Sequence, residues 1–301
     1  MNTIVVDHIS KTFGETRAVD DVSFEVAQGE LFGLLGPNGA GKTTAIRLIL
    51  DIFKPDSGTV AILGGEMTEA KKDRIGYLPE ERGLYQEIPL ERCLTYLASL
   101  KGLTRPQIRQ RLEPLLEKFD LVDHRKKKVK ELSKGMQQKA QLIVTIIHQP
   151  ELIIIDEPFS ALDPINTQMV KDMLREERNK GATIVMCTHQ MNQVEELCDR
   201  LVLIDRGRTM LYGELNEIRR RYASPEVIVR TLEPLPAVIN GITEIVPQNG
   251  DYKLSLAEGV RPNDVLGELL SSGLTMEKFE TALPTLDEIF IDVVQGKTGR
   301  A

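Results

Sequence analysis

The chain has 301 residues, a length that favours two domains of about 150 residues each. Hydrophobic residues make up 41% and charged residues 28% of the chain, which excludes a wholly disordered or fibrous protein. The 38 Lys and Arg residues against 45 Asp and Glu residues give a net charge of −7. A net acidic chain does not favour general nucleic-acid binding, because the phosphate backbone attracts basic surfaces.

Cysteine usage and hydropathy indicate the cellular compartment. The three cysteines, Cys93, Cys187 and Cys198, are odd in number and lack CxxC spacing. This pattern argues against a disulfide framework or a zinc site and suggests a reducing compartment. The N-terminal segment has no apolar run suited to a signal peptide, and no stretch approaches the ~20 apolar residues that span a bilayer. We therefore expect a cytoplasmic protein that does not itself cross the membrane.

The first half of the chain predicts strands followed by helices. Residues 1–30 contain two short apolar segments, TIVVDHI and VSFEV, that predict strands. The apolar run 31–36 leads through a glycine-rich turn into the helical spacing of residues 45–53. A strand, a glycine-rich turn and a helix are typical of phosphate-binding sites. Residues 88–150 alternate apolar and charged positions at helical period and predict several helices.

The second half predicts a parallel sheet and then a second domain. Residues 152–156 form a continuous apolar run, as expected for a strand buried on both faces, and ATIVMCTH and RLVLID repeat the pattern. Residues 167–180 fit a crossover helix between the first two of these strands. From residue 221 onward, two strand-like and two helix-like segments predict a small α+β domain. The expected domains are residues 1–220, with a helical subdomain at about 88–150, and residues 221–301.

A phosphate-binding loop is the strongest motif of the chain. Residues 36–43 fit the pattern G-x-x-x-x-G-K-[ST] between a predicted strand and a predicted helix. Glycines let backbone N–H groups close around phosphate oxygens, Lys42 reaches the β- and γ-phosphates, and the Thr43 hydroxyl suits Mg²⁺. The sequence therefore predicts a nucleoside triphosphate site. Its expected binding residues are Gly36, Pro37, Asn38, Gly39, Ala40, Gly41, Lys42, Thr43 and Thr44.

Two carboxylates end the buried strand of residues 152–156. Ligands of open α/β sheets bind at such strand ends. We expect Asp156 to hold Mg²⁺ and Glu157 to orient or deprotonate the attacking water. Neighbouring carboxylates point to opposite sides of an extended chain, so the two side chains are free to take separate roles. An isolated Asp-Glu pair would instead be interpreted as two solvated carboxylates.

The segment LSKGMQQ, residues 132–138, resembles the LSGGQ signature of the ATP-binding subunits of ABC transporters. The resemblance covers residues 1 to about 215 and implies an α/β P-loop core with a parallel sheet, N-terminal antiparallel strands and a helical subdomain. It implies ATP hydrolysis with ATP and Mg²⁺ as the bound species. Lys134 and Met136 replace two positions of the usual signature, and Ser133 and Gly135 match the residues that bind ATP.

Further positions match motifs of that family. Asp163, in SALD, resembles the D-loop, and His189, in CTH, resembles the switch histidine that assists catalysis. Phe13 matches the aromatic position that stacks on adenine. A lone histidine at a strand end is otherwise usually structural, and a lone phenylalanine is usually part of a core.

Glu80 departs from the pattern, because the family usually has Gln after YLP in the Q-loop. A carboxylate binds a divalent cation more strongly than an amide oxygen does. Our hypothesis is that Glu80 keeps the metal-binding role and changes the metal affinity or the rate of hydrolysis. The alternative is that Glu80 only faces solvent.

The family resemblance also implies partners. Two ATP-binding domains would meet head to tail, each holding ATP between its own phosphate loop and the other's Ser133–Gly135 segment. One copy of each motif implies a second chain, either identical or homologous. Integral-membrane subunits would complete the transporter and hold this subunit at the inner face of the membrane. The rival interpretations are a soluble ATPase acting on nucleic acid or ribosomes and a non-hydrolysing sensor, and we expect no nucleic-acid partner.

The C-terminal tail, LPTLDEIFIDVV, resembles the accessory domain of bacterial sodium-efflux and drug-efflux ATPases. That resemblance implies an exporter. A regulatory or dimer-bracing role and a passive cap on the core are both compatible with it. The basic runs 125–128 and 219–221 are expected to be solvated, with anionic lipid headgroups as the alternative partner.

Overall fold

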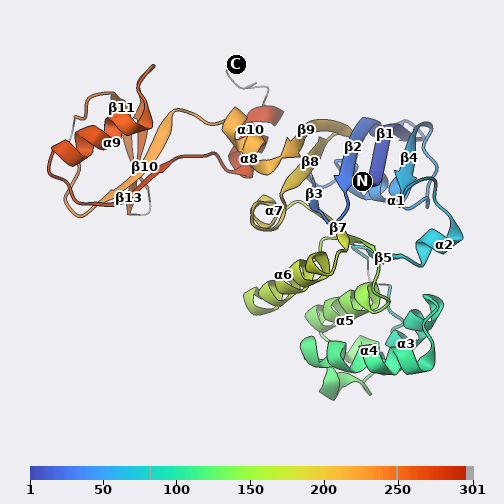
Figure 1. The fold of residues 1–301 in the computed structure, drawn as a ribbon. Coiled ribbons are helices and arrows are strands. Elements are labelled where there is room, and N and C mark those ends of the chain that lie inside the picture. Colours follow the sequence, from blue (N-terminus) through green and yellow to red (C-terminus); the bar gives the residue numbers. More distant parts are fainter. Residues whose placement is uncertain (82, 237, 249, 296–301) are drawn as a thin grey trace. The chain divides into compact units, whose positions relative to one another are not determined.

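The computed structural model describes residues 1–81, 83–236, 238–248 and 250–295. The chain divides into two compact units, residues 1–215 and residues 216–301 (Figure 1). Within the described residues, no helix is long and apolar enough to cross a membrane.

A six-stranded sheet forms the centre of the first unit. Its strand order is β5-β6-β7-β3-β8-β9, and the first five strands run parallel while β9 is antiparallel to β8. Because all residues of β3, β6 and β7 are buried, both faces of the sheet are covered. The bounds are β3 Leu31–Leu35, β5 Ile75–Leu78, β6 Leu152–Asp156, β7 Thr183–Thr188, β8 Arg200–Asp205 and β9 Arg208–Glu214.

A three-stranded antiparallel sheet of order β2-β1-β4 packs with helix α1 on one face of the central sheet (Figure 1). Strand β1 is Asn2–Phe13, β2 is Thr16–Ala27, β4 is Ser57–Ile62 and α1 is Lys42–Ile49. The stacked rings of Phe24 and Phe32, 5.5 Å apart at their centroids, join the two sheets. The strands are longer than the apolar segments of the sequence predict, because their outer positions are exposed and polar. Strand β4 was not predicted, because most of its positions are also exposed or half-buried.

The helices of the first unit form two groups. Helices α3 (Leu90–Leu100), α4 (Arg105–Lys118) and α5 (Lys134–Ile146) pack on one another, and α5 also packs on β5. A Cβ on Gly76 of β5 would lie 2.2 Å from the Thr145 carbonyl oxygen, so only glycine allows this close approach. Helices α6 (Pro164–Asn179) and α7 (Met191–Leu197) contact β7. The short helix α2 is Glu69–Lys72, and 3-10 turns cover Val122–His124 and Val129–Glu131.

The second unit is an antiparallel four-stranded sheet of order β11-β12-β10-β13 with helices. Its core includes Val227, Leu254, Val265 and Leu269. Strands β11 and β13 were not predicted from the sequence, because their exposed and charged residues give little apolar alternation. The bounds are α8 Leu215–Arg221, β10 Glu226–Thr231, β11 Ile242–Gln248, β12 Asp251–Leu256, α9 Pro262–Ser271, β13 Met276–Thr281 and α10 Leu286–Val294. The predicted α/β architecture with a smaller α+β part is confirmed.

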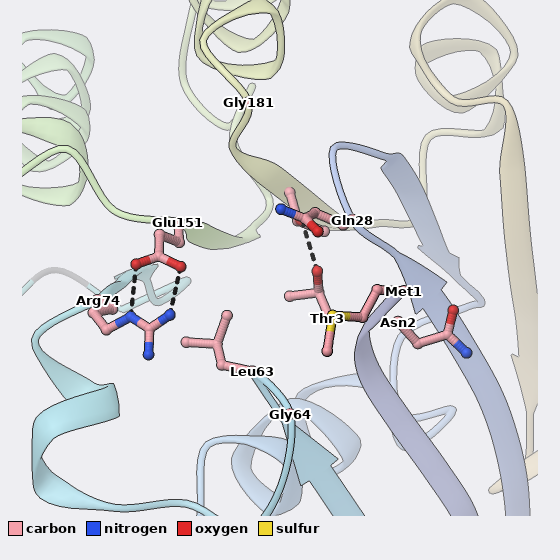
Figure 2. Close-up of a pocket in the computed structure, with 10 residues that line it drawn as sticks. Met1, Asn2, Thr3, Gln28, Leu63, Gly64, Arg74, Glu151 and Gly181 are labelled. Carbon is pink, nitrogen blue, oxygen red and sulfur yellow. Dashed lines mark hydrogen bonds and ion pairs between the residues drawn. The ribbon is translucent and has the colours of Figure 1, made fainter.

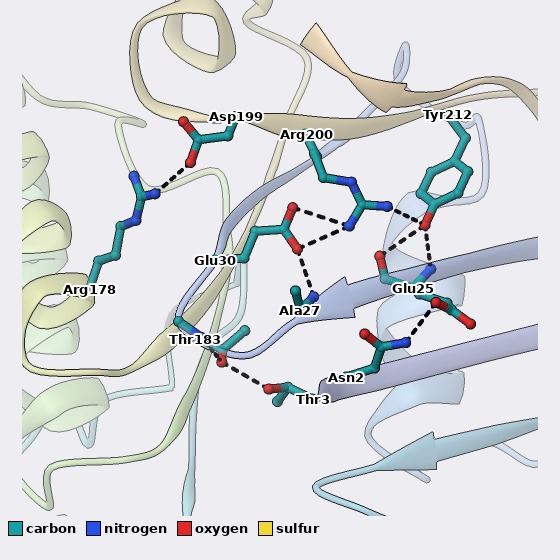
Figure 3. A network of polar contacts seen from close by, with 11 residues as sticks. Asn2, Thr3, Glu25, Ala27, Glu30, Arg178, Thr183, Asp199, Arg200 and Tyr212 are labelled. Carbon is teal, nitrogen blue, oxygen red and sulfur yellow. Dashed lines mark hydrogen bonds and ion pairs between the residues drawn. The ribbon is translucent and has the colours of Figure 1, made fainter.

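A polar network ties the antiparallel sheet to the central sheet (Figure 3). The buried Glu30 carboxylate accepts the Ala27 N–H at 2.6 Å and pairs with Arg200 at 3.3 Å. Arg200 donates to the Tyr212 hydroxyl at 2.6 Å, and that hydroxyl also accepts the Glu25 N–H at 3.1 Å. Strands β2, β8 and β9 are thereby joined by charge-assisted hydrogen bonds, which are stronger than neutral ones.

His148, just after α5, is held against the start of β5. Its Nε2 lies 3.2 Å from the Ile75 carbonyl oxygen, which also accepts from Lys101 Nζ at 3.0 Å. Burial, followed by the neighbouring Lys101 charge, lowers the pKa of His148 from 6.5 to about 4. The folded protein therefore holds this imidazole neutral, while the unfolded chain protonates it near pH 6.5.

We expect His148 to make the protein less stable in mild acid. Because its folded pKa is depressed, its contribution to stability is present above pH 6.5 and is lost as the pH falls towards 4, by about 3 kcal/mol in total. Urea unfolding between pH 7.5 and 4 would measure this loss. His148→Gln should flatten that part of the profile, while exposed His8→Gln, which removes a histidine whose pKa is raised by Asp21, should make it slightly steeper. An unchanged profile in His148→Gln would contradict the assignment.

Candidate functional site

The phosphate loop lies at the carboxyl end of β3, in the middle of the sheet. Gly36 has φ +150 and Gly41 has φ +106. A Cβ on Gly36 would lie 2.1 Å from the Ile204 carbonyl oxygen, and one on Gly41 would lie 2.3 Å from the Ala18 carbonyl oxygen. Both contacts are impossible for a larger residue, so the loop depends on glycine at both positions. The loop leads into α1, whose N-terminal N–H groups favour anions.

Lys42 and Thr43 begin α1 and are held by groups of the site itself. Lys42 Nζ donates to the carbonyl oxygens of Gly36 at 2.7 Å and Pro37 at 3.0 Å. Thr43 Oγ1 donates to Asp156 Oδ2 at 3.0 Å. The Lys42 ammonium group therefore lies against the carbonyl oxygens of its own loop.

Asp156 and Glu157 take different positions at the end of β6. Asp156 is the last residue of the strand and is 2% exposed. Glu157 has φ 52, a left-handed conformation that is uncommon for a non-glycine residue, and its N–H donates to the Cys187 carbonyl oxygen at 2.9 Å. We expected an extended chain to direct the two side chains to opposite sides. That reason is wrong, because the chain is not extended at Glu157. The turn at Glu157 separates them.

The Glu157 carboxylate is held by the end of β7. Its Oε2 accepts the Thr188 hydroxyl at 3.1 Å, and its Oε1 accepts the His189 N–H at 3.0 Å. His189 Nδ1 lies 2.7 Å from the same Oε1. Glu157 is 8% exposed, whereas the His189 side chain is half exposed. A buried carboxylate directed by two neighbouring residues is a suitable group for positioning water.

Most of the phosphate loop and the two carboxylates line one cavity of about 520 Å³, whose described lining does not include Gly36, Pro37 or His189. Glu80, just beyond β5, is exposed and lines this cavity together with both carboxylates of the β6 end. Of the phosphate loop, Asn38, Gly39, Ala40, Gly41, Lys42, Thr43 and Thr44 line it.

The oxygen donors of the cavity fit Mg²⁺, which takes one or two carboxylates in addition to substrate phosphates. The buried Asp156 carboxylate lies 3.0 Å from the Thr43 hydroxyl, and one of its oxygens lies outside that bond. Burial and the Asp156 charge raise the pKa of Tyr77 to about 12 and raise the pKa of Cys187 well above its usual value. Neither group belongs to the described lining of the cavity.

Phe13 lies at the end of β1, opposite Thr16 of β2, and Thr16 lines the cavity. The Phe13 ring is 43% exposed and contacts Phe53 edge to face at 5.3 Å. The residues described as lining the cavity do not include Phe13. Lys11 Nζ lies over the same ring, 5.7 Å from its centroid.

Ser133, Gly135 and Asp163 lie elsewhere on the surface of the first unit, outside the cavity lining described above. The Ser133 hydroxyl caps α5 by accepting the Met136 N–H at 3.2 Å. Asp163 caps α6 by accepting the Asn166 N–H at 2.9 Å, and this backbone bond lowers the pKa of Asp163. A Cβ on Gly135 would lie 3.1 Å from the Ala161 carbonyl oxygen, so the two predicted motifs are neighbours.

Five cavity residues were missed by the sequence analysis. They come from the start of β2 and from the turn between β8 and β9, where only an Arg-Gly turn dipeptide hints at a special conformation. They are Thr16, Arg17, Ala18, Arg206 and Gly207.

A second hollow, of about 230 Å³, lies at the amino ends of β5, β6 and β7, opposite the phosphate loop (Figure 2). Arg74 and Glu151 form a two-point ion pair there, at 2.6 and 2.5 Å. The Thr3 and Thr183 hydroxyls lie 2.9 Å apart. Because these groups bind each other, they stabilise the strand starts and offer no reactive group.

A glycine-dependent phosphate loop beside buried carboxylates, on a parallel sheet, defines a P-loop nucleotide-binding protein. Residues 19–160 match the ABC transporter family, and residues 213–294 match the C-terminal domain of the proteins described as ATP-binding protein DrrA1-3-like. The ABC transporter ATP-binding protein YhaQ of Bacillus subtilis is 38% identical over 97% of this chain and 98% of its own length. The chain belongs to the ATP-binding subunits of ABC transporters, a family that hydrolyses ATP to drive transport.

Two further similarities agree with this family. The daunorubicin resistance ATP-binding protein DrrA3 of Streptomyces coeruleorubidus is 31% identical over 96% of this chain and 94% of its own length. A solved ATP-binding subunit of an ABC transporter is 34% identical with a TM-score of 0.69, over 73% of this chain and 93% of that chain.

We expect Glu80→Gln to raise the Mg²⁺ concentration needed for half-maximal ATP hydrolysis several-fold, because an amide oxygen attracts a divalent cation less than a carboxylate does. Titration of Mg²⁺ at fixed ATP concentration would measure the change. Glu81→Gln, at an exposed neighbouring position outside the cavity lining, is the matched control. Identical Mg²⁺ curves for Glu80→Gln and the unaltered protein would contradict a metal-binding role for Glu80.

Proposed function

We propose that this subunit binds ATP with Mg²⁺ in the 520 Å³ cavity and hydrolyses it with Glu157 to drive export by a separate membrane subunit. The observation that carries the proposal is the Glu157 carboxylate, buried at the β6 end and held by Thr188 and His189 beside the phosphate loop. Bound Mg²⁺, held by Asp156, Thr43 and Glu80, would neutralise charge on the phosphate oxygens.

In this proposal each residue has one chemical task. Lys42 leaves the carbonyl oxygens of its own loop and binds the β- and γ-phosphates. Glu157 accepts the proton of a water molecule whose oxygen forms the new bond to the γ-phosphorus, while the bond to the ADP oxygen breaks. His189, half exposed and 2.7 Å from Glu157, is placed to bind the γ-phosphate and to keep the carboxylate oriented.

The Ser133–Gly135 segment supports a paired arrangement. It begins α5 at the surface, and its N–H groups suit a γ-phosphate bound in another subunit. In our proposal two subunits, identical or homologous, close around two ATP molecules, with Asp163 and its loop near the contact. Hydrolysis removes the bridging phosphate and separates the pair.

The direction of transport follows from the relatives. Named relatives include the daunorubicin and linearmycin resistance ATP-binding proteins and the Nod factor export ATP-binding protein I. We therefore propose an exporter whose integral-membrane subunit holds this chain at the inner face of the membrane. None of these named relatives favours a role on nucleic acid or ribosomes.

We expect Glu157→Gln to bind ATP with near-normal affinity but to lose hydrolysis by a factor of about 100 or more, because the amide does not accept the proton of the attacking water. With ATP and Mg²⁺ this variant should accumulate as a dimer on size exclusion chromatography. Glu195→Gln, on helix α7 and outside the described cavity lining, is the control substitution. Normal turnover in Glu157→Gln would remove Glu157 from the role of the base.

Gentle detergent extraction of native membranes should recover this subunit together with a protein that has several membrane spans. Affinity purification followed by mass spectrometry would identify that protein and, with it, the chain that selects the substrate. Recovery with ribosomal proteins only would leave ATP hydrolysis intact and overturn the export role.

A further inference from the structure

The turn between β8 and β9 has an unusual residue at its first position. Asp205 pairs with Arg208, so Arg206 and Gly207 form a two-residue hairpin loop. Their φ angles of 47 and 78 are both positive, as in a type I′ turn. Glycine suits the second position, while the first favours Asn, Asp or Gly and disfavours a long side chain such as Arg. Residues held in such sparsely populated conformations cluster at functional sites.

The turn is fixed against the phosphate loop. The Gly207 N–H donates to the Ala40 carbonyl oxygen at 2.8 Å, and the Gly207 carbonyl oxygen accepts the Asp20 N–H at 2.8 Å. A Cβ on Gly207 would lie 2.9 Å from the Ala18 carbonyl oxygen. These contacts set the position of the preceding residue, Arg206, which lines the nucleotide cavity.

The guanidinium group of Arg206 forms a longer ion pair than those of the nearby Arg17 and Arg208. Arg17 and Arg208 both form short ion pairs with Asp20, at 2.7 and 2.6 Å. Arg206 Nε lies 3.9 Å from Asp205, and its side chain is 89% exposed. A guanidinium group at a cavity edge with one long ion pair is well suited to bind an anion.

The sheet order determines which part of ATP reaches Arg206. Strand β6, with Asp156 and Glu157, and strand β8, which leads to Arg206, lie on opposite sides of β3 and the phosphate loop. The γ-phosphate must lie near Glu157, so the rest of the nucleotide crosses the loop towards β8. Beyond the β- and γ-phosphates, the next anionic group is the α-phosphate.

We propose that Arg206 binds the α-phosphate of the nucleotide and that the strained turn is kept in order to place this guanidinium group. The inference rests on the proposed binding of ATP in this cavity. Arg206 would then contribute to nucleotide affinity, although it lies outside the motifs from which the site was predicted.

The test uses the preference of a type I′ turn for Asn, Asp or Gly at its first position. Arg206→Asn places the favoured Asn-Gly pair in a type I′ turn, so the melting temperature should rise by about 2 °C. The same substitution should weaken binding of ATP, ADP and AMP by a common factor of roughly 10, because all three carry the α-phosphate. In the ATPase assay, KM should rise by that factor while kcat stays unchanged. A purely structural role would not combine higher stability with weaker binding.

Arg208→Ala, on the same hairpin but outside the cavity lining, is the matched control and should leave nucleotide binding unchanged. A loss confined to ATP would assign Arg206 to the γ-phosphate and overturn the proposal, as would unchanged affinity for all three nucleotides. If the unaltered protein binds none of them, the proposed function itself fails and this inference fails with it.

Discussion

The parallel alignment of β3, β6 and β7 is the constraint on which the site depends. Parallel strands end at one edge of the sheet, so the phosphate loop, the two carboxylates and His189 meet although they are far apart in sequence. The register holds because each strand is buried on both faces, where a slip would break the packing of every apolar side chain. The antiparallel sheet and α1 support this edge from one face, with the Glu30–Arg200–Tyr212 network joining the two sheets.

The polar groups of the site are hydrogen-bonded to one another. Lys42 binds carbonyl oxygens of its own loop, Thr43 binds Asp156, and Glu157 accepts bonds from the end of β7. These bonds avoid the free-energy cost of unpaired buried polar groups. In the proposed function, ATP and Mg²⁺ would take the place of several of these partners.

Two non-glycine residues of the cavity have left-handed backbone conformations, on opposite sides of the phosphate loop. Glu157 turns away from Asp156 and towards β7, and Arg206 projects from the β8–β9 turn. Each conformation costs free energy that the surrounding hydrogen bonds offset. In the proposed arrangement, one strained residue acts at the γ-phosphate and the other at the α-phosphate.

The sequence alone was sufficient to predict the phosphate loop, the Asp156–Glu157 pair and the family, because those functions depend on contiguous residues whose types are dictated by chemistry. It also predicted the α/β class, since buried parallel strands are continuous apolar runs. It did not indicate β4, β9, β11 and β13, whose exposed positions carry no apolar period, the four-residue strand β5, or the contribution of Arg206. That residue reaches the cavity only because β8 lies beside β3 and a hydrogen bond from Gly207 to Ala40 holds the turn in place. Long-range pairing of this kind is decided by tertiary packing, because no local pattern of residue types encodes it.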